Sequence, residues 1–181
     1  LRGALNRCLQ LVPEQRARGV VAASAGNHGL GVAFACRGLG IEALIVVPAG
    51  AVARKVDAIR ALGARVLHVQ GGYALAEAEG HRRALALGAV WVSPFNDAWV
   101  VAGQGTLGLE IESQWRTTLA SGEAEVYVPV GGGGLVAGIG AALEPWRPRV
   151  RVIGALPENS PYLHAFFHRG SMADVVERPT L

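Results

Sequence analysis

Two segments of the chain combine groups that can bind an anion with a position between a predicted strand and a predicted helix. Ser24-Ala25-Gly26-Asn27-His28-Gly29 offers a hydroxyl, a carboxamide, an imidazole and several backbone N–H groups. Gly131, Gly132, Gly133 and Gly134 follow the strand-like segment Val126–Val130 and precede the helix-like segment that begins at Leu135. Consecutive glycines allow close backbone approach and positive φ, and a helix N-terminus favours negative charge. The glycine turn is therefore predicted to hold a phosphate.

Neither segment is decisive alone. The glycine turn lacks the lysine and hydroxyl of a nucleoside-triphosphate loop, and no acidic residue stands where a dinucleotide fold binds ribose. It could instead be a flexible turn packed on a neighbouring helix. In the other segment, Ser24 or Asn27 could simply cap a helix and leave His28 exposed.

The elements that position these turns alternate between short β-branched runs and alanine-rich stretches of helical period, which predicts parallel sheets covered by helices on both faces. The predicted strands are 20–23, 43–47, 65–69, 89–92, 126–130 and 150–155. The predicted helices are 30–37, 53–62, 74–87, 101–120, 135–143 and 161–168. Four glycines are expected to cap helices in the left-handed conformation: Gly38, Gly63, Gly88 and Gly170. The expected fold class is α/β, with two lobes of open, mainly parallel twisted sheet.

Composition narrows the class of protein. The 181 residues are 51% hydrophobic, enough for a substantial core, and carry a formal charge of only +3 with scattered arginines, which argues against a nucleic-acid partner. Cys8 and Cys36 lie in segments that are expected to be helical, have no metal-ligand spacing and are expected to be buried thiols in a reducing compartment. Apolar stretches are short and the N-terminus has no basic region before an apolar run, so a cytoplasmic protein without membrane association is expected.

Several ungapped motifs together resemble the fold-type II pyridoxal 5'-phosphate (PLP) enzymes, and within them the serine/threonine dehydratase (threonine deaminase) and serine racemase group. The motifs that carry the resemblance are Leu1-Arg2-Gly3-Ala4, Ser24 to Gly29, Lys55 to Ala64, Ser93-Pro94-Phe95, Ala102 to Thr106 and Pro129 to Leu135.

The resemblance implies a role for each matching residue. Gly131, Gly132, Gly133, Gly134 and Leu135 would bind the cofactor phosphate through backbone N–H groups. Asn27 would hydrogen-bond the phenolic oxygen of the pyridine ring. Ser24, Ala25, Asn27 and His28 would form the loop that receives the substrate carboxylate. In domain terms, residues 1–18 and 99–181 would belong to the larger, phosphate-binding lobe, and 19–98 to the smaller lobe with the asparagine loop.

No catalytic residue is assigned within the chain. The family's motif places its Schiff-base lysine immediately before Leu1, and the only lysine present, Lys55, matches a different family position at the start of a helix. The chain is accordingly expected to be an internal fragment, without the lysine and the C-terminal part, that is inactive as printed.

For the intact protein, the resemblance implies β-elimination that converts L-threonine or L-serine to 2-oxobutanoate or pyruvate and ammonia, in a homodimer or homotetramer. Ala25 stands where serine racemases have a second serine, and since alanine cannot exchange protons, dehydration is favoured over racemisation. Leu156 and Tyr162 stand at the family's cation site, and since neither is a hard-cation ligand, no metal is expected.

Three alternatives stay open at this point. The first is a serine racemase. The second is another fold-type II lyase or synthase, such as a hydroxyaspartate dehydratase or a threonine synthase. The third is a ligand-binding regulatory module without catalysis, which a ribose-binding acidic residue would have favoured.

Overall fold

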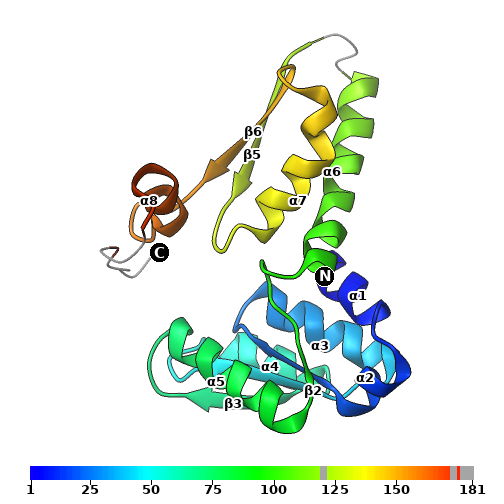
Figure 1. Cartoon of the computed structure of the whole chain (residues 1–181), viewed down its shortest axis with the longest axis vertical. Helices are drawn as coiled ribbons and strands as arrows, with labels where there is room; N and C mark the ends of the chain where they lie inside the picture. Colours follow the sequence, from blue (N-terminus) through cyan, green and yellow to red (C-terminus); the bar gives the residue numbers. More distant parts are fainter. Residues whose placement is uncertain (119–121, 172–174, 176–181) are drawn as a thin grey trace. The chain divides into compact units, whose positions relative to one another are not determined.

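The computed structural model describes residues 1–118, 122–171 and 175, and its described part divides into two compact units, Leu1–Gly103 and Gln104–Leu181 (Figure 1). Each unit is built from parallel strands with helices packed on them. No helix among the residues described is both long and apolar enough to cross a membrane.

A four-stranded parallel sheet forms the centre of the first unit. Its strands are β1 (Val20–Ala23), β2 (Ala43–Pro48), β3 (Arg65–Val69) and β4 (Val90–Trp91), in the spatial order β3-β2-β1-β4. All four residues of β1 are buried, as expected for a central parallel strand whose two faces are both covered. Since β1 lies between β2 and β4, the turn that follows β1 has a strand end on either side.

Helices cover both faces of this sheet. The helices of the first unit are α1 (Arg2–Leu9), α2 (Pro13–Arg18), α3 (Asn27–Leu39), α4 (Ala53–Ala61) and α5 (Tyr73–Leu87). Val20 and Ala22 of β1 face a core shared with α1, α3 and α4, whereas Val21 and Ala23 face α5. The predicted layered α/β arrangement is thus confirmed for this unit.

The interface between α1 and α3 is tight and apolar. Cys8 and Cys36 are both buried there, as predicted, with their Sγ atoms 3.9 Å apart. A Cβ placed on Gly31 would lie 3.2 Å from the backbone nitrogen of Leu1. The first residue of the chain therefore packs directly on the second turn of α3.

The long helix α6 (Ala98–Thr118) begins in the first unit and continues into the second. The other elements of the second unit are β5 (Ala124–Pro129), α7 (Gly134–Leu143), a 3-10 helix (Glu144–Trp146), β6 (Val150–Ala155) and α8 (Tyr162–Arg169). The two strands pair in parallel, with Ala124 opposite Val150 and Pro129 opposite Ala155. A core around Trp115, Val128 and Ile139 joins α6, α7 and the strands.

The structure corrects some details of the sequence prediction. Gly38 was predicted to cap a helix, but it lies inside α3, and the left-handed cap is Gly40 with φ 66°. Gly63, Gly88 and Gly170 do adopt positive φ as predicted. The prediction also missed α2, because a six-residue helix that starts at Pro13 is too short to show a hydrophobic period.

The two predicted lobes were assigned for the whole protein and not for this chain alone. In the structure, residues 1–18 are grouped with the first unit. The assignment of 1–18 and 99–181 to one lobe, and of 19–98 to the other, stays a prediction.

Candidate active site

The turn from Ser24 to His28 is built at the carboxyl end of the central strand β1. The N–H of Ser24 donates to the carbonyl oxygen of Val46 (3.1 Å), which extends the pairing with β2 by one residue. The Ser24 hydroxyl oxygen then accepts the N–H of Gly26 (3.1 Å), and α3 starts at Asn27. The four predicted residues Ser24, Ala25, Asn27 and His28 are thereby brought together in one turn.

The start of α3 leaves backbone donors available. No side chain caps this helix, and within the described residues no acceptor is found for the N–H groups of Asn27, His28 and Gly29. The alternative that Ser24 or Asn27 caps the helix is therefore wrong, since the Ser24 hydroxyl binds Gly26 instead. Three free N–H groups at the positive end of a helix are suited to bind a carboxylate or another anion, and the predicted role of this turn stays a prediction.

Gly29 allows the turn to fold tightly over the helix. A Cβ at this position would overlap the carbonyl oxygen of Ser24 and would also press on the side chains of Ile45 and Ile59. Glycine is required here by space, not by φ, because the position is helical and buried.

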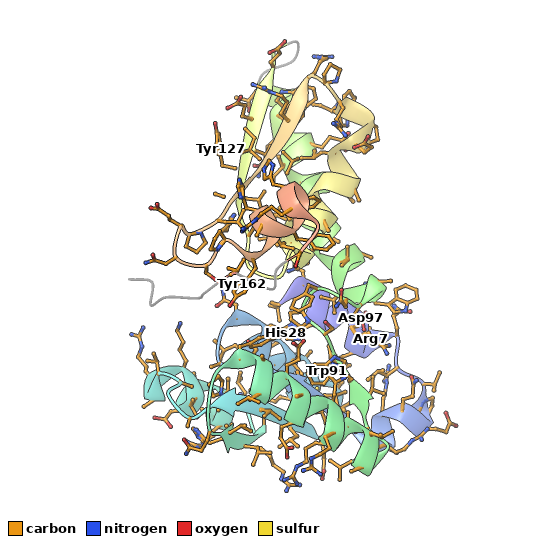
Figure 2. All side chains as sticks on the ribbon, turned by 60° about the vertical axis from the view of Figure 1, so that its left-hand side comes forward. Arg7, His28, Trp91, Asp97, Tyr127 and Tyr162 are labelled. Carbon is orange, nitrogen blue, oxygen red and sulfur yellow. The ribbon has the colours of Figure 1, made fainter. Side chains whose placement is uncertain are left out.

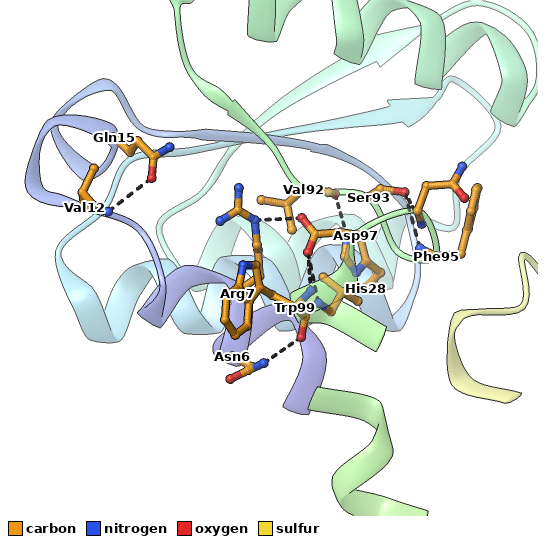
Figure 3. A network of polar contacts seen from close by, with 12 residues as sticks. Asn6, Arg7, Val12, Gln15, His28, Val92, Ser93, Phe95, Asp97 and Trp99 are labelled. Carbon is orange, nitrogen blue, oxygen red and sulfur yellow. Dashed lines mark hydrogen bonds and ion pairs between the residues drawn. The ribbon is translucent and has the colours of Figure 1, made fainter. Parts of the chain in front are cut away.

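His28 is fixed by a hydrogen bond to the end of the neighbouring strand. Its Nε2 lies 2.9 Å from the carbonyl oxygen of Val92 (Figure 3). Since a carbonyl oxygen can only accept, Nε2 carries the proton. Burial lowers the pKa of His28 below its usual value, and the bond to Val92 opposes this shift only in part. The ring is therefore neutral at pH 7 and is not the exposed side chain of the capping alternative.

A second polar cluster joins α1 to the start of α6. Arg7 Nε donates to Asp97 Oδ2 at 2.7 Å, and Asp97 Oδ1 accepts the N–H groups of Trp99 (2.9 Å) and Val100 (3.1 Å). Asn6 adds a bond from its Nδ2 to the carbonyl oxygen of Trp99 at 2.7 Å. Figure 2 places Arg7, Asp97 and His28 in the same region of the first unit. Asp97 thus caps α6 and anchors α1 at once.

Sequence reasoning did not find this cluster. Asp97 before a helix is a recognisable N-cap signal, but its ion-pair partner Arg7 is 90 residues away in the chain. The bond from His28 to Val92 spans 64 residues and has no local signal either.

The glycine turn of the second unit lies between β5 and α7. Val130 continues the sheet by donating to the carbonyl oxygen of Ala155 (2.8 Å). Gly133 has φ +92°, and a Cβ there would lie 2.9 Å from Leu163 Cδ1, whereas a Cβ on Gly131 would meet nothing within 4 Å. The turn is thus open to solvent at Gly131 and closed to side chains at Gly133.

The N-terminus of α7 completes this turn. Gly133 is its N-cap and has no side-chain bond, and the part of the chain that the structure describes offers no acceptor to the N–H groups of Gly134, Leu135 and Val136. A glycine turn with free N–H groups at a helix start fits a phosphate. The alternative of a flexible turn packed on a neighbouring helix stays open, because a Cβ on Gly133 would press on Leu163 of α8.

Other residues considered from the sequence take no part in these two turns. Lys55 lies exposed on α4. No cluster of three or more His, Cys, Asp or Glu side chains suited to a metal is present in residues 1–118, 122–171 and 175. The expectation that Leu156 and Tyr162 leave the cation position without ligands stays a prediction.

A family model described as pyridoxal-phosphate dependent enzyme matches residues 1–181. The chain belongs to this family. The resemblance drawn from the sequence motifs is confirmed, and PLP is the cofactor of the family.

The chain is similar to proteins of known function. The chain is 46% identical over 181 residues to an L-threonine ammonia-lyase of Thermotoga maritima, covering 100% of this chain and 44% of that protein. It is 41% identical to the biosynthetic L-threonine dehydratase of Escherichia coli, covering 97% of this chain and 33% of that protein. The chain thus spans less than half the length of either relative.

The chain is also similar to solved structures of threonine deaminase and serine racemase. The processed form of threonine deaminase isoform 2 from Solanum lycopersicum superposes with a TM-score of 0.82 at 36% identity, covering 99% of this chain and 49% of that one. Maize serine racemase superposes with a TM-score of 0.83 at 31% identity, covering 99% and 52%. The predicted fold class, α/β of the fold-type II PLP enzymes, is confirmed.

Proposed function

We propose that the intact protein is a PLP-dependent dehydratase that converts L-threonine, or L-serine, to 2-oxobutanoate or pyruvate and ammonia. The observation that carries the proposal is that each unit has a parallel strand followed by a helix whose first N–H groups have no acceptor among the described residues. One start suits a carboxylate and the other a phosphate, which are the anionic groups of an amino-acid substrate and of PLP. The identity to threonine ammonia-lyases and dehydratases supports a hydroxy amino acid as the substrate.

The glycine turn fits the cofactor's phosphate on the geometry of this structure. Gly131 leaves open space, Gly133 excludes any side chain, and Gly134 and Leu135 present N–H groups at the start of α7. A dianionic phosphate there gains from the helix dipole as well as from hydrogen bonds. When bound, PLP supplies an electron-accepting ring that stabilises negative charge at the substrate's α-carbon.

The turn in the first unit would bind the substrate carboxylate and the phenolic oxygen of the cofactor. The free N–H groups of Asn27, His28 and Gly29 would receive the substrate carboxylate, with Ser24 and Ala25 forming the wall of the turn. The Asn27 side chain is exposed and free to hydrogen-bond the phenolic oxygen of the pyridine ring. Fixing the carboxylate holds the α-carbon in one orientation, which lowers the entropy cost of proton removal.

The start of α1 supports the expected place of the lysine. Leu1 packs on Gly31, one helical turn from Asn27. A lysine immediately before Leu1 would thus begin its side chain beside the first turns of α3.

Ala25 favours dehydration over racemisation. A racemase needs an acid or base on each face of the α-carbon, and a methyl group can neither take nor give a proton. Serine racemase nevertheless stays the second candidate, because maize serine racemase superposes over almost the entire chain. Hydroxyaspartate dehydratase, threonine synthase and a non-catalytic ligand-binding module are the remaining alternatives.

Full-length protein tests the proposal directly. It should absorb as a PLP enzyme, lose that absorbance on borohydride reduction, and release a 2-oxo acid from L-threonine or L-serine within a panel of hydroxy amino acids. Formation of D-serine from L-serine, measured by chiral chromatography, would support the racemase instead. Protein that retains no PLP would support the binding module.

The cellular setting is part of the same proposal. We propose a cytoplasmic homodimer or homotetramer that takes a small amino acid as substrate, with neither nucleic acid nor a membrane as partner. Light scattering of the full-length protein after gel filtration tests the oligomeric state.

A further inference from the structure

The turn after β1 is attached to both strands that neighbour β1. On one side the N–H of Ser24 donates to Val46 at the end of β2, and on the other the imidazole of His28 bonds to Val92 just beyond β4. Because the strand order is β3-β2-β1-β4, these two bonds reach the sheet on opposite sides of the turn. Of the three free N–H groups, that of Asn27 lies between the two bonded residues in the sequence, that of His28 belongs to one of them, and that of Gly29 follows directly.

The acceptor of the histidine bond belongs to a buried residue that is itself bonded to β1. Val92 is fully buried, and its own N–H donates to the carbonyl oxygen of Val21 in β1 at 2.9 Å. A hydrogen bond to this carbonyl therefore fixes the first turn of α3 relative to the sheet (Figure 3).

The hydrogen bond at Nε2 fits a fixed anchor. The Nε2 proton is committed to Val92, so this atom is not available to a substrate. Burial disfavours the imidazolium, so the ring adds no positive charge that could bind a carboxylate by ion pairing. Through Nε2 the side chain holds the backbone from which it projects, while Nδ1 keeps its lone pair as an acceptor.

We propose that His28 is a positioning residue, whose Nε2–H tautomer anchors the start of α3 to the end of β4 so that the N–H groups of the turn are preorganised for the substrate carboxylate. This inference rests on the proposed function. The inference goes beyond the proposed function because it gives the His28 side chain a role of its own. The backbone of the turn would bind the substrate carboxylate, and the His28 side chain would act through that backbone.

Two substitutions by amide side chains distinguish the effect of the hydrogen bond to Val92 from the effect of side-chain size. In His28→Gln the side-chain nitrogen sits near the place of Nε2 and can still donate to Val92. His28→Asn carries the same amide on a side chain one methylene shorter and falls short of that carbonyl. A lost hydrogen bond that leaves a buried acceptor unpaired typically lowers an equilibrium constant about tenfold. In the full-length holoenzyme, His28→Asn is thus expected to raise KM for L-threonine about tenfold with a smaller change in kcat, and His28→Gln to restore most of it.

Two further measurements do not depend on turnover. Binding of L-alanine, which has the carboxylate but no leaving group, is followed by the change in cofactor absorbance and should weaken in His28→Asn by the same factor as KM rises. Hydrogen exchange of the hydrogen-bonded amides that hold the turn, those of Ser24, Gly26 and Leu30, should speed up in PLP-free full-length protein with His28→Asn and not with His28→Gln. Affinity for PLP should fall less than affinity for L-alanine, because the phosphate turn is on α7 and only Asn27 is expected to contact the cofactor from the turn that His28 anchors.

The matched control is His68→Asn. His68 lies exposed on β3, where its ring contacts only the surface side chain of Arg60 among the interactions found in the described residues. It should leave KM and amide exchange as in the wild type. Equal KM and exchange in His28→Asn and wild type, or equal defects in His28→Asn and His28→Gln, would overturn the inference while the dehydratase activity stands. A wild-type protein that neither binds PLP nor releases 2-oxo acid would overturn the proposed function, and this inference with it.

Discussion

Asp97 has two tasks, and substitutions can separate them. One carboxylate oxygen caps α6 through the N–H groups of Trp99 and Val100, and the other accepts the guanidinium N–H of Arg7. The side chains of Arg7 and Asp97 are only 16% and 12% exposed, so the pair is poorly screened by water. The bond anchors α1, which is the helix that follows the expected lysine.

The expected losses follow from these contacts. Asp97→Asn keeps an oxygen for the cap but removes the charge opposite Arg7, and should lower the free energy of unfolding by about 2 kcal/mol, somewhat less than the ~3–5 kcal/mol for breaking a fully buried pair. Asp97→Ala also loses the cap, worth about 1 kcal/mol, for a total of about 3 kcal/mol. Arg7→Met combined with Asp97→Asn should cost less than the sum of the single changes by about 1–2 kcal/mol.

Equilibrium urea unfolding followed by far-UV circular dichroism measures these differences. The control is Glu144→Gln, because Glu144 and Arg147 form a pair whose side chains are 64% and 70% exposed, and its loss should leave the midpoint unchanged. Equal losses for Asp97→Asn and Asp97→Ala would refute the cap, and additive losses in the double variant would refute the ion pair.

Three further predictions concern the two turns. Gly29→Ala places a Cβ against the Ser24 carbonyl oxygen and should raise KM for L-threonine at least about tenfold, measured by 2-oxo-acid release, since the turn must open. Gly133→Ala forces an L-residue to φ +92° at about 1–2 kcal/mol and should weaken PLP binding about tenfold by absorbance titration, whereas Gly140→Ala, with open space inside α7, should not. Because burial lowers the pKa of His28, the unfolded chain takes up a proton first as pH falls below about 6.5, so urea stability should fall there and stay flatter in His28→Gln.

Local sequence pattern predicts the elements of this protein well because each strand and helix carries its own period. β1, β3 and β6 begin and end at the predicted residues. The errors occur where the local signal is shared or weak, as at Gly38 and Gly40, two glycines close enough that only the observed φ identifies the cap.

The two candidate turns were also accessible from sequence. Ser24 to His28 follow β1 directly, and Gly131 to Gly134 follow β5 after one residue. The groups of each turn are therefore close together in the chain and need no long-range contact to form the turn. Sequence alone could not tell whether Ser24 caps α3, because the hydroxyl can reach either the helix or the N–H of Gly26.

What the amino-acid sequence by itself determined is therefore the family, the alternation of strands and helices, and the position of the two candidate turns, because all three reside in contiguous residues. Only the tertiary structure decided how the turn after β1 is held. The strand order places β4 beside β1, and this brings Val92 to His28 across 64 residues, while the approach of α1 to α6 brings Arg7 to Asp97 across 90. Such contacts depend on which elements become neighbours, and a one-dimensional pattern does not carry that information.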